Sequence, residues 1–305
     1  MKSDITIAVL AHVSDETLSD GNTGKVVFGR LEILEMILAS LAAYNDVGAV
    51  PIAIFDTGDM DERKILERIS RFGFHGIVKS SKEGFCAPVP GNGSRDFFRY
   101  GRTSRWSTEF RDKAMRFIES CGAAVTYALS RGSHYILAIE GDAVLFGRNY
   151  VERLIESLGE HTLASCTLRG KVQTDFWIAN TPKMAPIVRE LEGAMRPPYH
   201  SEDAFSEVFT DRVDLNDVFI GEKSLDQMLP SQTNGLGLEK DYFAEHKYSW
   251  ITHPSQQQMA EVAEFLSLLP GTGVKRTGRF IFRRAGTLFR NALKEKLKGR
   301  IGRPR

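Results

Sequence analysis

Apolar and amphipathic stretches alternate along the first part of the chain and predict strands and helices in turn. Apolar runs at residues 5–11, 50–55 and 134–139 have strand length and show no polar face, as in strands covered on both faces of a parallel sheet. Between them, residues 26–44, 61–72 and 107–131 repeat their apolar positions with the period of a helix. This order predicts an α/β fold with a mostly parallel central sheet flanked by helices.

Two of these helices have faces that can be named residue by residue. In the first, the apolar side is formed by Leu31, Leu34, Ile37, Leu38 and Leu41, whereas Arg30, Glu32 and Glu35 are offset from it. In the 107–131 helix, Phe110, Ala114, Phe117 and Cys121 form the apolar face, and Arg111, Lys113 and Arg116 lie off it. We expect the apolar sides to be buried.

Shorter elements continue the pattern as far as residue 208. Strands are predicted at 76–78, 163–167 and 176–179, and helices at 150–158, 182–195 and 201–208. Residues 80–103 are rich in Gly, Pro, Ser and Arg and are predicted as a long loop. Because long loops inside a compact domain usually serve a site, we expect this loop to form part of the substrate pocket and to act as its lid.

The cysteines and the N-terminus favour a cytoplasmic protein. The three cysteines, Cys86, Cys121 and Cys166, are far apart and form no CxxC pair, which argues against a disulfide framework or a zinc site. The first apolar run is far shorter than the ~20 residues that span a bilayer, and no later run reaches that length. Any membrane contact is therefore expected to be peripheral.

The C-terminal tail differs in charge from the rest of the chain. Residues 275–305 carry twelve Lys or Arg and one acid, a net charge of +11, whereas the remaining residues carry −10. Within residues 279–305, apolar side chains recur at helical spacing among the basic ones, which predicts an amphipathic helix suited to an anionic membrane surface. Docking on its own acidic domain or on another subunit is the alternative, and no nucleic acid is expected as a partner. We divide the chain into a catalytic domain at 1–260 and this helical extension at 261–305.

A carboxylate cluster, Glu140-Gly141-Asp142, follows the most hydrophobic strand. Ligands of open α/β sheets bind at the carboxyl ends of strands, and glycine lets a bulky ligand approach the backbone. Two acids suffice for a magnesium-like ion, which fills its other positions with water and substrate phosphates. An ordinary acidic turn after a strand is the alternative interpretation.

The segment from Tyr135 to Phe146 resembles the GT-A glycosyltransferases, in which a hydrophobic strand ends in acid-x-acid. The resemblance implies a Rossmann-like domain that binds a nucleotide-sugar donor together with Mn²⁺ or Mg²⁺. It makes Asp142 a metal ligand and places Glu140 at the metal, through water, or at the nucleotide ribose. Glu140 departs from the family, where Asp is commoner at this position.

The same resemblance assigns roles to residues elsewhere in the chain. His12 and Asp56 end the first two strands, where such enzymes hold the nucleotide base and ribose; a turn cap is the alternative for Asp56. Arg111 or Lys113 would face the diphosphate, or else form a solvated helix face. His253 would complete the metal or diphosphate site.

The pair Glu202-Asp203 matches the family's x-Glu-Asp element, in which one carboxylate deprotonates the acceptor hydroxyl. The resemblance gives that role to Asp203 first and to Glu202 second. A structural account is also complete: Ser201 would be an N-cap, and acids in a first helical turn complement the helix dipole.

Together these observations predict a metal-assisted glycosyltransferase that moves a sugar from a nucleotide-sugar to a hydroxyl of a lipid-linked or envelope glycan. We expect it in the cytoplasm, held at the inner face of the cell membrane by residues 279–305. A nucleotidyltransferase acting on sugar phosphates is the rival enzyme. A non-catalytic protein that binds membrane or nucleic acid is the rival from another class.

Overall fold

The structure is a computed structural model. It describes residues 4–14, 17–19, 26–31, 34–35, 37–38, 41, 50–70, 77–79, 95–99, 109–141, 143–146, 150–168, 170–216, 219–222 and 248–252. The predicted membrane-surface segment 279–305, and with it the whole extension 261–305, lies outside these residues.

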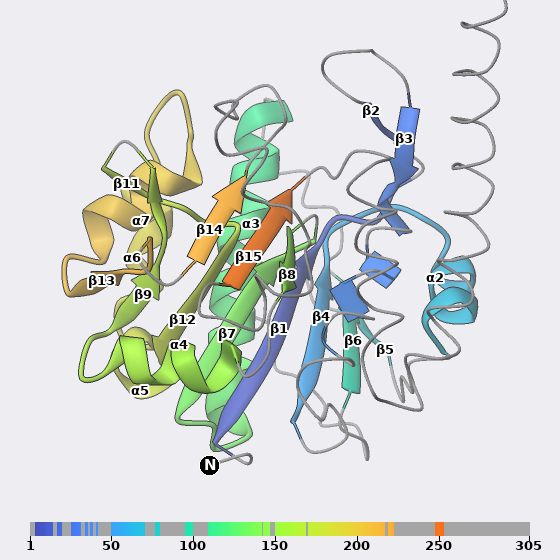
Figure 1. Ribbon diagram of the computed structural model, residues 1–305. Helices are drawn as coiled ribbons and strands as arrows, with labels where there is room; N and C mark the ends of the chain where they lie inside the picture. The colour runs from blue at the N-terminus through green and yellow to red at the C-terminus, as the bar shows by residue number, and fades with distance from the viewer. Residues whose placement is uncertain are drawn as a thin grey trace, which may run out of the picture.

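An eight-stranded sheet forms the centre of the molecule (Figure 1). Five neighbouring strands are parallel, and the antiparallel β12 joins them to an edge pair whose two strands are parallel to each other. The predicted fold class, a mostly parallel sheet flanked by helices, is therefore confirmed. In spatial order the strands are β13 (Arg212–Asp214), β9 (Leu163–Ser165), β12 (Phe176–Asn180), β7 (Tyr135–Glu140), β1 (Ile5–Ala11), β4 (Ile52–Asp56), β6 (Arg95–Arg99) and β5 (Ile77–Lys79).

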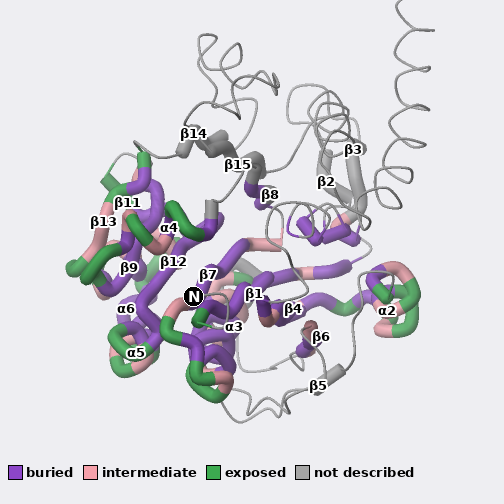
Figure 2. The backbone as a smooth tube through the Cα atoms, turned by 60° about the horizontal axis from the view of Figure 1, so that its bottom comes forward, coloured by how far each residue is buried: buried purple, intermediate pink, exposed green. Residues whose placement is uncertain are grey.

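Strand β1 lies at the centre of the parallel part, between β4 and β7, and every residue in it is buried. This explains why its sequence is apolar without alternation. The tube in Figure 2 shows the same burial along β7 and β4. All three strands end at the same edge of the sheet, which brings residues far apart in sequence together there.

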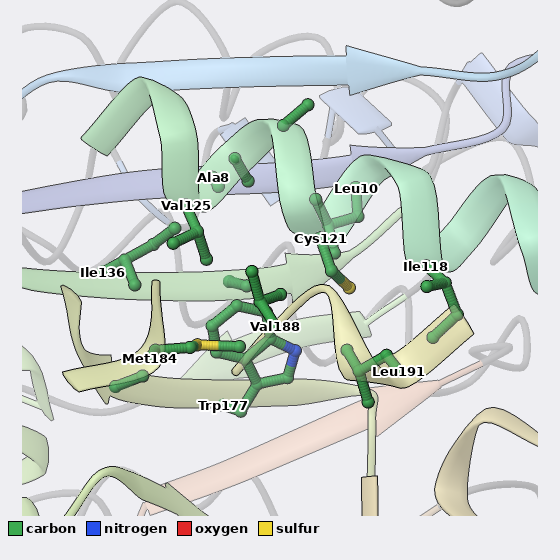
Figure 3. Packing of buried hydrophobic residues seen from close by; sticks show 14 of the residues in the cluster. Ala8, Leu10, Ile118, Cys121, Val125, Ile136, Trp177, Met184, Val188 and Leu191 are labelled. Carbon is green, nitrogen blue, oxygen red and sulfur yellow. The ribbon is translucent and has the colours of Figure 1, made fainter. Parts of the chain in front are cut away.

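Helix α3 (Glu109–Ser130) covers one face of the sheet over β1, β4 and β7. Its buried side packs against Leu10, Ile136 and Trp177, as Figure 3 shows. Three short helices pack against α3 and complete this core. They are α5 (Thr181–Met184), α6 (Glu190–Ala194) and α7 (Ser201–Val208). Helix α4 (Tyr150–Leu158) packs on β9 and β12, and α2 (Glu62–Ile69) follows β4.

The first predicted helix is correct in its buried face but wrong in its start. Residues 26–29 form β3 (Val26–Gly29), paired with β2 (Thr17–Ser19), and helical residues begin at Arg30. The five leucine and isoleucine residues predicted to be buried are all buried. Glu35, predicted off that face, is buried as well and lies 3.9 Å from an Arg68 guanidinium nitrogen.

Two further predictions are corrected. The loop predicted at 80–103 contains β6, whose apolar core is only the pair Phe97-Phe98 between charged residues, too short to stand out by pattern. The helix predicted at 182–195 is split into α5 and α6. Pro186 lies between them and lacks the N–H that a continuous helix requires.

Smaller pairings complete the described part. Strand β15 (Tyr248–Thr252) joins β14 (Phe219–Glu222) to β8 (Ala143–Phe146), and β10 (Thr167–Leu168) forms a hairpin with β11 (Lys171–Val172). Among the helices that the structure describes, none is long and apolar enough to cross a bilayer.

Candidate functional site

A cleft opens at the carboxyl edge of β1 and β7, beside the first half of α3. It encloses about 630 Å³ of space, part of it open solvent. The ends of β1 and β7 both contribute to its lining. The lining residues are Leu10, Ala11, His12, Arg30, Thr57, Lys113, Arg116, Phe117, Ser120, Glu140 and Gly141.

The charges in this cleft are mostly positive. Among the described residues that line it, Arg30, Lys113 and Arg116 contribute three basic side chains and Glu140 the one carboxylate. Lys113 and Arg116 lie one helical turn apart on α3, so both point to the same side. The basic side chains suit an anionic ligand. Glu140 suits a part of that ligand that carries hydroxyl groups or a bound cation.

The end of β7 approaches β1 so closely that only glycine fits there. The Gly141 N–H donates to the Leu10 carbonyl at 2.6 Å, and a Cβ on Gly141 would lie 2.6 Å from the Ala11 Cα. The Glu140 N–H donates to the Asp175 carbonyl at 2.8 Å. These two contacts fix the backbone at the strand end and turn the Glu140 side chain into the cleft.

His12 lies at the mouth of the cleft, next to Thr57. Its Nδ1 is 3.2 Å from the Thr57 hydroxyl oxygen, and that hydroxyl donates to the Ala11 carbonyl at 3.2 Å. Which of the two side chains donates in the contact between His12 and Thr57 depends on the tautomer of the imidazole.

Asp56 ends β4 but does not line the cleft. Its Oδ1 accepts hydrogen bonds from the Val13 N–H at 2.8 Å and the Gly58 N–H at 2.9 Å, and Arg99 Nε lies 3.3 Å from Oδ2. The residue is fully buried, and burial raises the pKa of this carboxyl, although its hydrogen bonds and Arg99 oppose the shift. These contacts match the turn-cap interpretation of Asp56.

Glu202, the first acid of the pair on α7, is connected to Glu140 in the cleft through two hydroxyl groups. The Thr174 hydroxyl donates to Glu140 Oε1 at 3.0 Å and lies 3.3 Å from the Ser201 hydroxyl oxygen. Ser201 in turn donates to Glu202 Oε2 at 3.3 Å. The two carboxylates that the sequence places far apart are therefore bridged by a chain of side-chain contacts.

Asp203 points elsewhere. Its Oδ1 lies 2.5 Å from Lys171 Nζ on β11, and both side chains are about half exposed. The same hairpin is held on α7 by a hydrogen bond from the Val172 N–H to the Ser206 hydroxyl at 2.9 Å. Of the two acids, Glu202 is thus the one in contact with the chain that leads to the cleft.

The predicted N-cap role of Ser201 is wrong. The N-cap position of α7 is occupied by His200, whose side chain makes no capping hydrogen bond. The Ser201 hydroxyl is used instead in contacts with Thr174 and Glu202. Just before the helix, Tyr199 adopts a positive φ of 64°, a conformation uncommon for a non-glycine residue.

Three predicted site residues are not placed. Asp142 and His253 lie outside the described residues, and the side chain of Arg111 is not described although its backbone belongs to α3. Within the part of the chain that the structure describes, no group of three or more His, Cys, Asp or Glu residues could hold a metal ion. The metal-ligand assignments to Asp142, Glu140 and His253 stay predictions.

Sequence reasoning missed the roles of Arg30, Arg116 and Thr174. Arg30 and Arg116 were recognised only as residues off the apolar faces of their helices, and the shared edge of the sheet brings them together. Thr174 carries no motif signal. It meets Glu140 because β12 runs antiparallel to β7 with Phe176 opposite Ile139, a pairing that cannot be read from the sequence.

Comparisons with known proteins give structural neighbours only. No family model matches the chain, and no curated protein matches it. A cytidylyltransferase from Leptospira borgpetersenii serovar Hardjo-bovis (strain JB197) is 15% identical, with 69% of this chain and 76% of that chain covered and a TM-score of 0.38. The 4-diphosphocytidyl-2C-methyl-D-erythritol synthase from Anaerococcus prevotii DSM 20548 is 12% identical, with 70% and 86% covered and a TM-score of 0.39. A protein assigned as a nucleotide-diphospho-sugar transferase from Desulfovibrio desulfuricans G20 is 12% identical, with 68% and 79% covered and a TM-score of 0.41.

Proposed function

We propose that this protein is a transferase that binds a nucleotide-sugar in the cleft and moves the sugar to a hydroxyl group of a glycan or lipid-linked acceptor. The observation that carries the proposal is the meeting of Arg30, Lys113 and Arg116 with Glu140 at the carboxyl edge of the sheet. A nucleoside diphosphate requires several positive charges, and its ribose and sugar hydroxyls require an acceptor such as a carboxylate.

The reaction has two needs, and the described residues can meet both. The bond between the anomeric carbon and the diphosphate oxygen breaks, and its electron pair leaves with the nucleoside diphosphate. The cationic side chains of the cleft stabilise that developing charge. The acceptor oxygen forms the new bond to the anomeric carbon while its proton passes to a carboxylate, for which α7 offers Glu202 and Asp203.

A divalent ion fits this site as part of a metal–nucleotide complex. Glu140 supplies one carboxylate at the strand end, and ions such as Mg²⁺ take one or two carboxylates and complete their shell with water and phosphates. Asp142 is the expected second ligand. When bound, the metal would neutralise charge on the diphosphate; holding and orienting the nucleotide remains the task of the cleft side chains.

Nucleotidyl transfer is the second candidate, favoured by the three basic side chains, which would also suit a triphosphate. That reaction joins a phosphate to a phosphorus atom and needs no base for a sugar hydroxyl. The contacts that connect Glu140 to Glu202 on α7 therefore favour glycosyl transfer. Membrane recruitment by residues 279–305 stays a prediction; a chain shortened to end near Gly273 that still bound anionic liposomes would contradict it.

Calorimetric titration with UDP, GDP and CDP, each with and without Mn²⁺, tests the proposal. One of the three should bind, and Arg116→Ala should weaken it about tenfold or more, as expected when a charge-assisted hydrogen bond is lost. Arg153→Ala is the matched control because Arg153 is exposed on α4 and pairs with Glu156. Absence of binding by all three nucleotides, or equal loss in both variants, would reject the nucleotide site. Release of nucleoside diphosphate from the sugar donor would then distinguish glycosyl from nucleotidyl transfer.

A further inference from the structure

One stripe of α3 lines the cleft, and its chemistry changes along the helix. The α3 residues in the lining follow one another at helical spacing and therefore lie on one side of the helix. They are Lys113, Arg116, Phe117 and Ser120. Phe117 is the only residue with a phenyl ring among the described residues that line the cleft. The basic pair suits an anionic group of the ligand, whereas the ring suits an apolar surface.

The ring of Phe117 is supported by other aromatic residues. Its centroid lies 6.2 Å from that of Phe205 on α7. Phe205 packs in turn on Trp177 at 5.9 Å and on Phe209 at 5.2 Å, and these three residues are buried. Phe117 is only partly buried and lines the cleft. The cluster therefore fixes the ring of Phe117 and leaves part of it open to a ligand.

The contact with Phe205 places Phe117 on the side of the cleft that faces α7. Phe205 lies one helical turn after the two acids that begin α7, which the proposed function offers as bases for the acceptor hydroxyl. His12 and Thr57 mark the other side, where β1 and β4 end. Figure 1 shows α7 and β4 on opposite sides of β1 and β7.

The position of the ring decides which part of a nucleotide-sugar it meets. In the proposed transfer, the sugar is the part of the donor that must reach the acceptor, so it lies toward α7. One surface of a pyranose carries hydroxyl groups, which the polar side chains of the cleft can bind. Its other surface carries C–H groups, which pack favourably on the negative face of an aromatic ring.

From this geometry we infer that Phe117 is the platform on which the sugar of the donor stacks. The contact makes Phe117 a specificity-determining residue, because it favours a nucleotide-sugar over the free nucleotide. The inference rests on the proposed function, since it names the residue that recognises the transferred group of that reaction.

Calorimetric titration of Phe117→Leu with two matched ligands tests the contact. The probes are UDP, GDP or CDP, whichever binds, and the corresponding UDP-glucose, GDP-mannose or CDP-glucose. Loss of the ring should weaken binding of the nucleotide-hexose about three- to tenfold and change binding of the nucleoside diphosphate less than about twofold. Phe117→Tyr, which keeps the ring, should bind both ligands like the wild type. If Phe117→Leu does not fold, Phe117→Met makes the same test.

Phe209→Leu is the matched control, because Phe209 belongs to the same aromatic cluster but does not line the cleft. It should lower the free energy of unfolding and leave the binding of both ligands unchanged. The same loss of nucleotide-hexose affinity in Phe209→Leu and Phe117→Leu would mean that the cluster acts through packing, and would overturn the inference. Unchanged binding in Phe117→Leu, or equal weakening of both ligands, would overturn it as well.

NMR of the wild type with isotope-labelled phenylalanine gives a direct second measurement. With the ring signals of Phe117 assigned by Phe117→Leu, proton–proton contacts to the bound nucleotide-hexose should be found at the hexose and not at the base. Contacts to the base alone, or none to the hexose, would overturn the inference. If none of the nucleotides or nucleotide-hexoses binds, the proposed function fails. If they bind and Phe117 has no effect, only its role as a platform fails, so the two failures are distinguishable.

Discussion

Asp56 and Glu140 end the two strands on either side of β1, at nearly the same level of the sheet, and the structure uses them in opposite ways. Asp56 pairs in register with Ala11, and Glu140 with Leu10. Asp56 is fully buried and holds two backbone N–H groups and Arg99. Glu140 is half-buried and faces the cleft, where its side chain accepts a hydrogen bond from Thr174.

The difference arises from what the surrounding backbone offers to each carboxylate. After β4, the chain turns so that the N–H groups of Val13 and Gly58 both point at Asp56, and Gly58 has no room for a side chain because its Cβ would lie 1.9 Å from the Val13 carbonyl oxygen. After β7, the N–H groups of Glu140 and Gly141 are already taken by carbonyls. An acid at a strand end is therefore not by itself a functional site; the neighbouring donors decide.

The largest expected effect is on the structural side of this comparison. Asp56→Ala leaves two buried N–H groups and the Arg99 charge without their acceptor, and should lower the free energy of unfolding by about 3–5 kcal/mol. Chemical denaturation near neutral pH measures this. Asp56→Asn keeps one acceptor oxygen and should lose less. A loss below 1 kcal/mol in Asp56→Ala would remove the distinction between the two acids.

Glu140→Gln should lower activity and leave stability nearly unchanged, the reverse of what we expect for Asp56→Ala. Its side chain keeps the shape and the Thr174 contact but loses the charge in the cleft, so turnover of the nucleotide-sugar should fall by roughly 10²-fold, the scale for removing one electrostatic contact to the reacting groups. Its unfolding free energy should change by less than about 1 kcal/mol because the residue is half exposed. Equal turnover in Glu140→Gln and wild type would exclude Glu140 from the chemistry.

The inner strands of the sheet could be predicted from the sequence because strands buried on both faces are apolar along their length. Residues 5–11 and 134–139 are almost entirely apolar, and both lie at the centre of the sheet. Strand β6 escaped prediction because Phe97 and Phe98 are its only apolar residues, and its third buried residue, Asp96, is charged. Its place in the sheet comes from pairing with β4 and β5, which is tertiary information.

The candidate site could also be predicted in part from the sequence. Glu140 stands out because a polar residue follows a buried strand, and Glu202-Asp203 stands out as an acidic pair at a helix start. The different surroundings of Glu202 and Asp203 were not available from sequence, since they depend on the contact of β11 and its following residues with α7. Resemblance ranked Asp203 first as the base, and that ranking stays a prediction.

The smallest expected effect is on the pH dependence of stability, to which Asp56 and Asp211 should contribute with opposite signs. Burial raises the pKa of Asp56 above its ordinary 3.8, so the folded protein binds this proton more tightly than the unfolded chain. The stability of the wild type relative to Asp56→Asn should therefore fall as the pH rises from 3.8 through the folded pKa. Hydrogen bonds from Val13 and Gly58 offset part of the desolvation, which keeps the effect below the loss expected for Asp56→Ala.

Asp211 provides the internal comparison for this last experiment. Hydrogen bonds from Thr162 and His161 lower the pKa of the Asp211 carboxyl below 3.8. The stability that Asp211 contributes is therefore present above 3.8 and is lost as the pH falls through its folded pKa, so wild type relative to Asp211→Asn should gain stability with rising pH in that range. Thermal or urea unfolding between pH 3 and 6 on the three proteins measures both slopes. If both stability differences changed with pH in the same direction, the partners of Asp56 would hold its carboxyl in the ionised form. The contrast between Asp56 and Glu140 would then rest on their exposure alone.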